Sequence, residues 1–332
     1  MGDIVARDGS NTSNIKERTN KGHGSVNKIV TTLNERHYGK HQFKAAMLMR
    51  GGKLVGGMLT NSECWINITK KDVEKLEVPD IILQKKILSA KGNPSKCFMQ
   101  LELGIIPIKF VLKLKRLNFL HYILNEDTDS MISQVYHTMK EDSKKGDYIG
   151  LISKDKLDLG INLTDSEIKD LPRSSWKRYI KETVTSASLL YLVEENSSKN
   201  KTKHIVFNEL KLNEYLMKYE KISTSIIIFY TRSKTLEIKN WAPWKFENDL
   251  CVACDNHSET MCHFMTCNSY TNEPYSRWKN VDENDCMKQL EAGKAIEKRF
   301  LERKAMIEKQ EAGQAQLLDS TAPGDRRAML QL

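Results

Sequence analysis

The spacing of apolar side chains predicts a chain built mainly of helices. From residue 12 to residue 145, apolar residues recur at the three- and four-residue spacing of a helix face. A second periodic segment spans Phe43–Trp65 and is loosened by two glycine pairs. Thr69 precedes an acidic first turn, which predicts a helix start, with a bend at Pro79. Pro107 begins a further helix.

The second half of the chain is less regular. Residues 141–165 form a polar connection, where we place a domain boundary, and Thr164 opens a long helical stretch. Residues 196–203 are typical of a solvated linker, and the mixed segment after them holds β-type residues at Ile226–Tyr230. Residues 283–313 predict a helix whose opposite charges interleave, which is typical of an exposed helix or a partner-binding arm.

Composition narrows the function classes. The 332 residues are 39% hydrophobic and 29% charged, without an apolar run long enough to span a membrane and without a secretory signal. We therefore expect an intracellular protein, in the cytoplasm or the nucleus, that has no membrane partner. Lys and Arg outnumber Asp and Glu by 52 to 43, which gives a net charge of +9. This surplus favours a polyanionic partner such as nucleic acid, although many basic proteins bind none.

The cysteine pattern predicts a metal site. Cys251 and Cys254 form a CxxC pair, and His263 and Cys267 follow at a spacing of four residues. Three sulfurs and one imidazole suit a structural Zn²⁺ ion, because zinc takes four such ligands in a tetrahedron. Cys262 and His257 lie nearby and are alternative ligands. The competing interpretation is a set of scattered thiols beside an exposed histidine.

A basic stripe follows Pro107. Lys109, Lys113 and Arg116 fall on one helix face, with Lys115 beside them, and no acidic residue occurs between Leu103 and Asn125. An uncompensated stripe of this kind suits a phosphate backbone. A surface helix with merely solvated charges is the alternative.

The sequence offers little evidence for a catalytic site. The sequence contains no phosphate-binding loop, no GxSxG elbow and no HExxH motif. Nuclease-like E-x-K triplets occur at residues 167–169 and 237–239, but a lysine-rich chain produces such triplets by chance.

Taken together, several segments resemble the C-terminal part of a non-LTR (LINE-like) retrotransposon reverse transcriptase. The resemblance covers residues 2–270 and is carried by GDIVARDGSNTSNIKERTNKGHG (2–24), LTNSECWINITKKDVEKLE (59–77), LELGIIPIKFVLKLKRLNFLHYILNED (101–127) and ETMCHFMTC (259–267). In that family the catalytic palm precedes the matching region, so the resemblance implies a chain that lacks polymerase activity. Family members often carry a nuclease beside the Cys-His array, but no PD…K pattern follows Cys267 here.

The resemblance implies a thumb that contacts a template–primer duplex, a connector and a zinc-knuckle-like module. The expected fold is mainly α, with a helical thumb-like bundle, a helical connector, the zinc module and a charged helix. The expected divisions are 1–11 (palm edge), 12–145 (thumb), 146–245 (connector), 246–275 (zinc module), 283–313 (charged helix) and 314–332 (flexible tail). The expected partner is an RNA–DNA hybrid or element RNA, with a protein partner for the charged helix. A zinc-stabilised protein-interaction module and a metal-dependent endonuclease are the alternatives.

Overall fold

A computed structural model describes residues 11–36, 38–66, 68–90, 92–142, 147–218, 222–241 and 245–320, without the side chains of 40 and 314–320. The chain divides between Ile222 and Ser223 into two compact units, each of which is described by itself. Within the described residues the fold is mainly helical, and the β-structure amounts to one isolated antiparallel bridge.

The first unit contains α-helices, short 3-10 helices and one π-helix, η2. Its elements are α1 (Thr12–Glu35), η1 (Gly39–His41), α2 (Gln42–Met49), η2 (Arg50–Val55), α3 (Gly56–Met58), η3 (Ser62–Cys64), α4 (Lys70–Ile87), α5 (Lys96–Leu103), α6 (Ile108–Asn125), α7 (Met131–Glu141), α8 (Tyr148–Asp158), α9 (Asp165–Asp170), α10 (Arg173–Ser197) and η4 (Glu214–Leu216). The second unit contains α11 (Ile222–Arg232), α12 (Met261–Thr266), η6 (Trp278–Asp282) and α13 (Cys286–Ser320).

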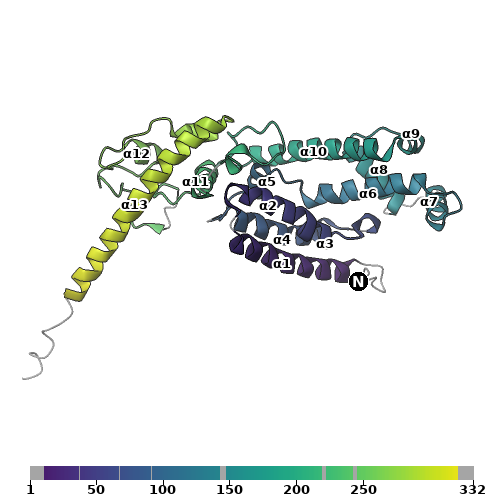
Figure 1. Ribbon diagram of the computed structural model, residues 1–332, viewed down its shortest axis with the longest axis horizontal. Helices are drawn as coiled ribbons and strands as arrows, with labels where there is room; N and C mark the ends of the chain where they lie inside the picture. Colours follow the sequence, from purple (N-terminus) through teal and green to yellow (C-terminus); the bar gives the residue numbers. More distant parts are fainter. Residues whose placement is uncertain are drawn as a thin grey trace, which may run out of the picture. The chain divides into compact units, whose positions relative to one another are not determined.

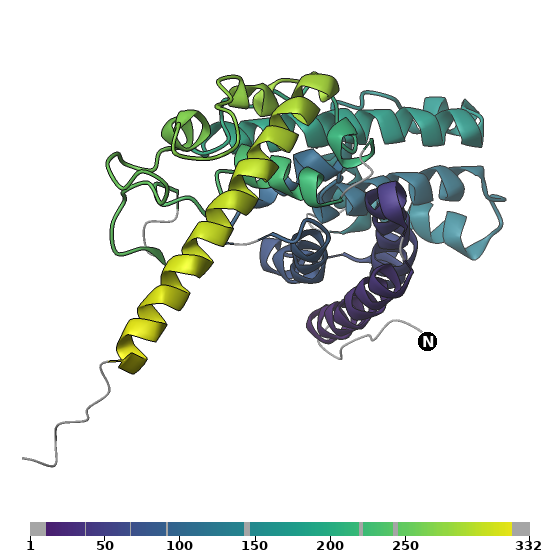
Figure 2. The ribbon, with the colours of Figure 1, turned by 60° about the vertical axis from the view of Figure 1, so that its left-hand side comes forward.

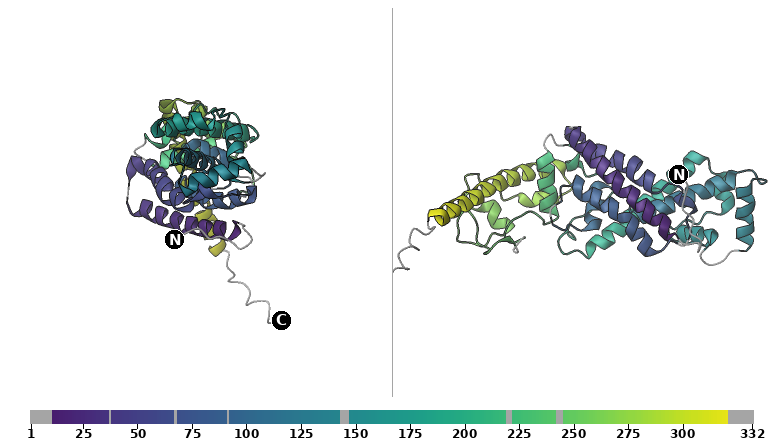
Figure 3. Two further views of the ribbon diagram at one scale, coloured as in Figure 1. Left: turned by 90° about the vertical axis from the view of Figure 1, so that its right-hand side faces the viewer. Right: turned by 90° about the horizontal axis from the view of Figure 1, so that it is seen from below.

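At one edge of the first unit, α1 lies along α4 (Figure 1; Figure 3, right). The two helices approach closely at Gly22, where an added Cβ would lie 2.9 Å from Pro79 Cγ. The start of α4 is the predicted one, because Thr69 caps the helix and forms a capping box with Asp72. Arg50 joins η2 to α4 through a buried, two-pronged ion pair with Asp80, at 2.6 and 2.7 Å.

Helix α6 lies in the interior of the first unit and runs beside α10 (Figure 1). It begins after Pro107, as predicted, and its apolar side chains enter two of the hydrophobic clusters. One cluster combines α6, α7, α8, α9 and α10 and includes the fully buried Trp176, whose indole N–H donates to Leu117 O at 3.2 Å. This single core therefore extends across the boundary predicted at residues 141–165.

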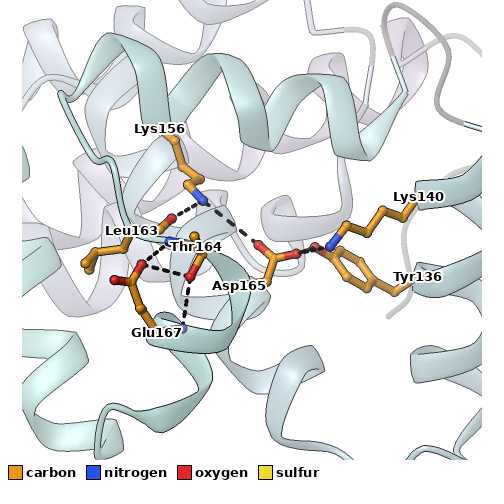
Figure 4. A network of polar contacts seen from close by, with 7 residues as sticks. All are labelled: Tyr136, Lys140, Lys156, Leu163, Thr164, Asp165 and Glu167. Carbon is orange, nitrogen blue, oxygen red and sulfur yellow. Dashed lines mark hydrogen bonds and ion pairs between the residues drawn. The ribbon is translucent and has the colours of Figure 1, made fainter.

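A polar network ties α7, α8 and α9 together at the edge of that core (Figure 4). The Asp165 carboxylate accepts from Tyr136 Oη at 2.9 Å and from Lys140 Nζ at 2.7 Å, and it lies 3.9 Å from Lys156 Nζ. Burial and the neighbouring Asp165 charge raise the pKa of Tyr136, so its hydroxyl stays a hydrogen-bond donor at neutral pH. These contacts position α9, and with it the start of α10.

Two sequence expectations differ from the structure. Helix α8 lies within the predicted polar connection, because Tyr148 and Ile152 turn into the shared core. The β-type residues of Ile226–Tyr230 form helix α11, whose side chains are buried around most of its circumference. A short buried apolar run fits a strand or a helix equally well, and periodicity does not separate them. Helix α5 falls within the region predicted as helical, residues 12–145, although no separate helix was predicted there.

The expected charged helix of residues 283–313 is present as α13, which continues as one uninterrupted helix to Ser320 (Figure 2). Of the expected tail, residues 321–332 lie outside the described residues. The expected palm edge, residues 1–11, also lies outside them except for Asn11.

Candidate metal centre

The four predicted ligands come together in the second unit. The antiparallel bridge closes a loop that carries Cys251 and Cys254, while His263 lies in α12 and Cys267 directly follows that helix. One ligand atom from each residue lies within 4.8 Å of the other three. The group can therefore hold a metal ion.

Local hydrogen bonds give the loop its shape. Cys251 N donates to His257 O at 2.7 Å, and Asp255 N donates to Cys251 O at 2.8 Å. Asp255 adopts a positive φ of 49°, which turns the chain sharply after the CxxC pair. Thr260 caps α12 by accepting from His263 N at 3.1 Å. The cap fixes the helical turn that carries the imidazole.

The distances between ligand atoms match a tetrahedral site. Cys251 Sγ lies 4.0 Å from Cys267 Sγ, and Cys254 Sγ lies 3.3 Å from His263 Nε2. A Zn–S bond of about 2.3 Å in a tetrahedron places two sulfurs about 3.8 Å apart. Cys251 and Cys267 are buried, whereas Cys254 and His263 are half-buried, so the cluster lies at the edge of the fold.

The two alternative ligands lie outside this group. Cys262 is exposed. The His257 ring stacks on the His263 ring, with centroids 5.1 Å apart, and its side chain hydrogen-bonds to the Cys254 sulfur. His257 thus contacts two residues of the group and is not itself a member of it.

The protein environment shifts the pKa values of two of the thiols in opposite directions. Hydrogen bonds from the Asn256 backbone and from His257 and His263 lower the pKa of Cys254 to about 5. Burial, helped by the neighbouring thiolates, raises the pKa of Cys251 to about 11. Without a cation Cys251 is therefore protonated at neutral pH, and a bound metal would displace its proton.

Helix α13 supplies a buried arginine beside the cluster. Arg299 is 1% exposed, and its guanidinium donates to four backbone carbonyls at 2.7–3.2 Å, those of Phe264, Cys267, Asn272 and Glu273. Burial lowers the pKa of Arg299, which the negative charges of Cys267 and Glu302 partly oppose. Sequence reasoning missed this residue, because in an interleaved charge pattern it resembles its exposed neighbours.

Two further side chains of α13 hold the same module. Arg303 forms a buried, two-pronged ion pair with Glu259, at 2.9 and 2.7 Å. Glu302 accepts from the backbone N–H groups and side chains of Thr271 and Asn272. This part of the predicted charged helix therefore packs against the cysteine module instead of standing free in solvent.

Aromatic residues near the cluster belong to its core. Tyr270 is 4% exposed and packs edge-on against Phe264, with ring centroids 5.6 Å apart, and under the Arg299 guanidinium. Trp241 is half-buried, and Trp244 lies outside the described residues. The packing of Tyr270 leaves no ring face for a nucleic-acid base.

The predicted basic stripe is compensated by acids from another helix. Arg116 is 7% exposed and pairs with Asp155 of α8 through two hydrogen bonds, at 2.6 and 3.1 Å. Lys113 pairs with Asp158 and lies 3.9 Å from Asp155. The segment itself contains no acidic residue, and its acidic partners lie about 40 residues away along the chain. The local sequence therefore could not reveal that the stripe is compensated.

The other two residues of the stripe are also engaged. Lys115 pairs with Glu63 at 2.9 Å. Lys109 is half-buried over the Tyr191 ring, and this burial lowers the pKa of its ammonium group to about 8. The four residues thus do not form the free cationic stripe that the sequence suggested, and binding of nucleic acid through them stays a prediction.

The two E-x-K triplets have structural uses. Glu167 closes the capping box of α9 with Thr164. Glu237 pairs with Lys245 at 2.7 Å.

No protein-family model, curated protein or solved structure matches this chain. Among the described residues, no helix is both long and apolar enough to cross a bilayer. The functional assignment therefore follows from the residues of the chain itself.

Proposed function

We propose that Cys251, Cys254, His263 and Cys267 hold a structural Zn²⁺ ion. The observation that carries this proposal is the placement of four ligand atoms within 4.8 Å of one another. Thiolate and imidazole donors in a tetrahedron favour zinc over the oxygen-preferring Mg²⁺ and Ca²⁺. Three sulfurs and one nitrogen fill all four positions, which leaves no position for a reactive water. The ion would stabilise the second unit and would not take part in hydrolysis.

The charge of Arg299 supports three thiolate ligands. Zn²⁺ with three thiolates and a neutral imidazole carries a net charge of −1. The Arg299 guanidinium is buried beside this site, hydrogen-bonds to backbone carbonyls, and has its charge opposed only in part by the nearby Glu302. A buried cation without a counter-charge is costly. The zinc–thiolate centre would supply that counter-charge.

Metal analysis of the purified full-length chain tests the zinc assignment. We expect about one zinc per chain. Cys254→Ser and Cys267→Ser should each lose most of it, whereas Cys262→Ser, which changes an exposed cysteine outside the group, should retain it. Substoichiometric zinc in the wild type, or equal loss from the Cys262→Ser control, would contradict the proposal.

We further propose that the first unit binds nucleic acid, as the thumb region of a reverse transcriptase would. The resemblance of residues 2–24, 59–77 and 101–127 supports this function. The charge distribution supports it as well: residues 223–332 contain one more acidic than basic residue, so the whole basic surplus belongs to residues 1–222. A surplus of basic residues in one unit favours binding to a phosphate backbone.

Titration of the full-length chain with an RNA–DNA hybrid tests the second proposal. Affinity should fall steeply between about 50 mM and about 200 mM salt, because phosphate contacts release counterions. If the chain binds neither hybrid nor single strand at low salt, the proposal fails and a zinc-stabilised protein-interaction module takes its place. Magnesium-dependent cleavage of the hybrid would instead favour the endonuclease.

A further inference from the structure

A groove in the first unit combines aromatic rings with exposed cations, and these two kinds of group point to one ligand chemistry. It lies between α6 and the segment that joins α9 to α10, and its volume is about 860 Å³. This size falls within the range of small-molecule sites. Its floor includes His121 and Trp176, whose rings stack with centroids 5.8 Å apart. His121 Nε2 also donates to Leu171 O at 2.9 Å, which ties the His121 ring to the segment before α10.

Aromatic faces form one wall of the groove. Phe119 and Tyr122 lie one helical turn apart on α6, and their rings stack at 5.9 Å with an interplanar angle of 13°. Tyr122 is 46% exposed, and a hydrogen bond to Glu126 raises its pKa, so the ring stays neutral at physiological pH. An exposed neutral ring of this kind can stack on a planar base.

Three exposed cations line the opposite side. Lys169, Arg173 and Lys177 carry no ion pair within the described part of the chain. The acids that also line the groove are Asp170, Glu63 and Glu126. The Glu63 carboxylate is already paired with Lys115, and that of Glu126 accepts from Tyr122. The side of the groove at the start of α10 therefore has an excess of positive charge.

We propose that this groove binds a nucleoside phosphate, either free or as one unpaired residue of a single strand. The base would stack on Tyr122, and the phosphate would contact Arg173 and Lys177. The inference rests on the proposed function in one respect: both require a site that prefers phosphate groups. In this proposal the phosphate contacts lie at the start of α10 and not on the basic stripe of α6, whose charges are already paired.

The experiment compares AMP with a short single-stranded oligonucleotide on the full-length chain. Tyr122→Ala should weaken binding of both about tenfold, because stacking is lost, whereas Tyr122→Phe should bind as the wild type does. Arg173→Glu with Lys177→Glu should weaken both and reduce the salt slope for the strand by about 1.4. The charge-matched control is Lys201→Glu with Lys203→Glu, two exposed lysines outside the groove.

The outcomes separate the two proposals and the two sources of ligand. Competition between AMP and the strand supports one shared site, and AMP binding alone assigns the groove to a free nucleotide. If the groove variants bind both ligands as the control does while the wild type binds hybrid, the groove proposal fails and the proposed function stands. If the wild type binds AMP but no nucleic acid, the proposed function fails and the groove stands. If it binds nothing, both fail.

Discussion

At the scale of single residues, several buried charges in the first unit pair with residues on other helices. The Arg116–Asp155 pair is the clearest, since both side chains are at least nine-tenths buried. Removing one member of such a pair leaves an uncompensated buried charge. Asp155→Asn should therefore lower the free energy of unfolding by about 3 kcal/mol, as measured by urea denaturation.

Asp158→Asn is the matched control for this change. Asp158 also contacts Lys113, but its side chain is 39% exposed, so its loss should cost less than about 1 kcal/mol. Equal losses for the two variants would contradict the view that Arg116 depends on Asp155.

Asp165 gives a prediction for pH dependence at the same scale. Burial by itself would raise its pKa, but hydrogen bonds from Lys140 and Tyr136 and the charge of Lys156 outweigh burial, so the pKa lies below its ordinary value of 3.8. Its stabilising contribution is therefore complete above the ordinary pKa and is lost as pH falls through the lower, folded value. Asp165→Asn should cost about 1 kcal/mol near neutral pH.

The cost of Asp165→Asn should be smaller when unfolding is measured below the ordinary carboxyl pKa of 3.8 than when it is measured near neutral pH, because the contribution of the carboxylate is lost as the pH falls toward the lower, folded pKa. Asp129→Asn changes an exposed carboxylate on the loop before α7 and serves as the control. A cost that does not vary with pH would assign the role of Asp165 to side-chain shape instead of charge.

At the scale of elements, the sequence predicted helices where local signals were strong. Caps and prolines marked the starts of α4, α6 and α9, because those interactions lie within one helical turn. The cluster of Cys251, Cys254, His263 and Cys267 could be predicted for the same reason, because these residues lie in two short segments. Helix α11 and the partners of Arg116 and Arg299 depend on contacts far along the chain, which no local pattern encodes.

Helix α13 offers two glycines with opposite expected behaviour. A Cβ on Gly293 would lie 2.5 Å from Cγ1 of Ile228, a fully buried side chain of α11, whereas a Cβ on Gly313 would meet nothing within 4 Å. Alanine improves helix propensity by about 0.5–1 kcal/mol at either position, but overpacking costs about 1–3 kcal/mol. Gly293→Ala should therefore lower thermal stability of the second unit, and Gly313→Ala should leave it unchanged or raise it.

Circular dichroism melts of the two variants measure this difference. A stabilising Gly293→Ala would mean that Ile228 adjusts without cost and that α11 and α13 are not closely packed at this point.

At the scale of the whole molecule, the two units rely on different sources of stability. The first unit contains extended hydrophobic clusters, among them the one around Trp176. The second combines a smaller apolar core with the cysteine cluster. Structural zinc contributes about 10–16 kcal/mol of folding free energy in small zinc modules. Removal of the metal should therefore affect one unit alone.

Hydrogen exchange of the full-length chain with and without a chelator measures this effect. Backbone amides of residues 249–267 should lose protection when zinc is removed, because the CxxC loop and α12 lose their common ligand. Amides of α6 and α10 should keep their exchange rates, since the core between these helices contains none of the four metal ligands. Loss of protection in both units would show that they unfold together, and unchanged protection around α12 would mean that the cysteine module folds without a metal.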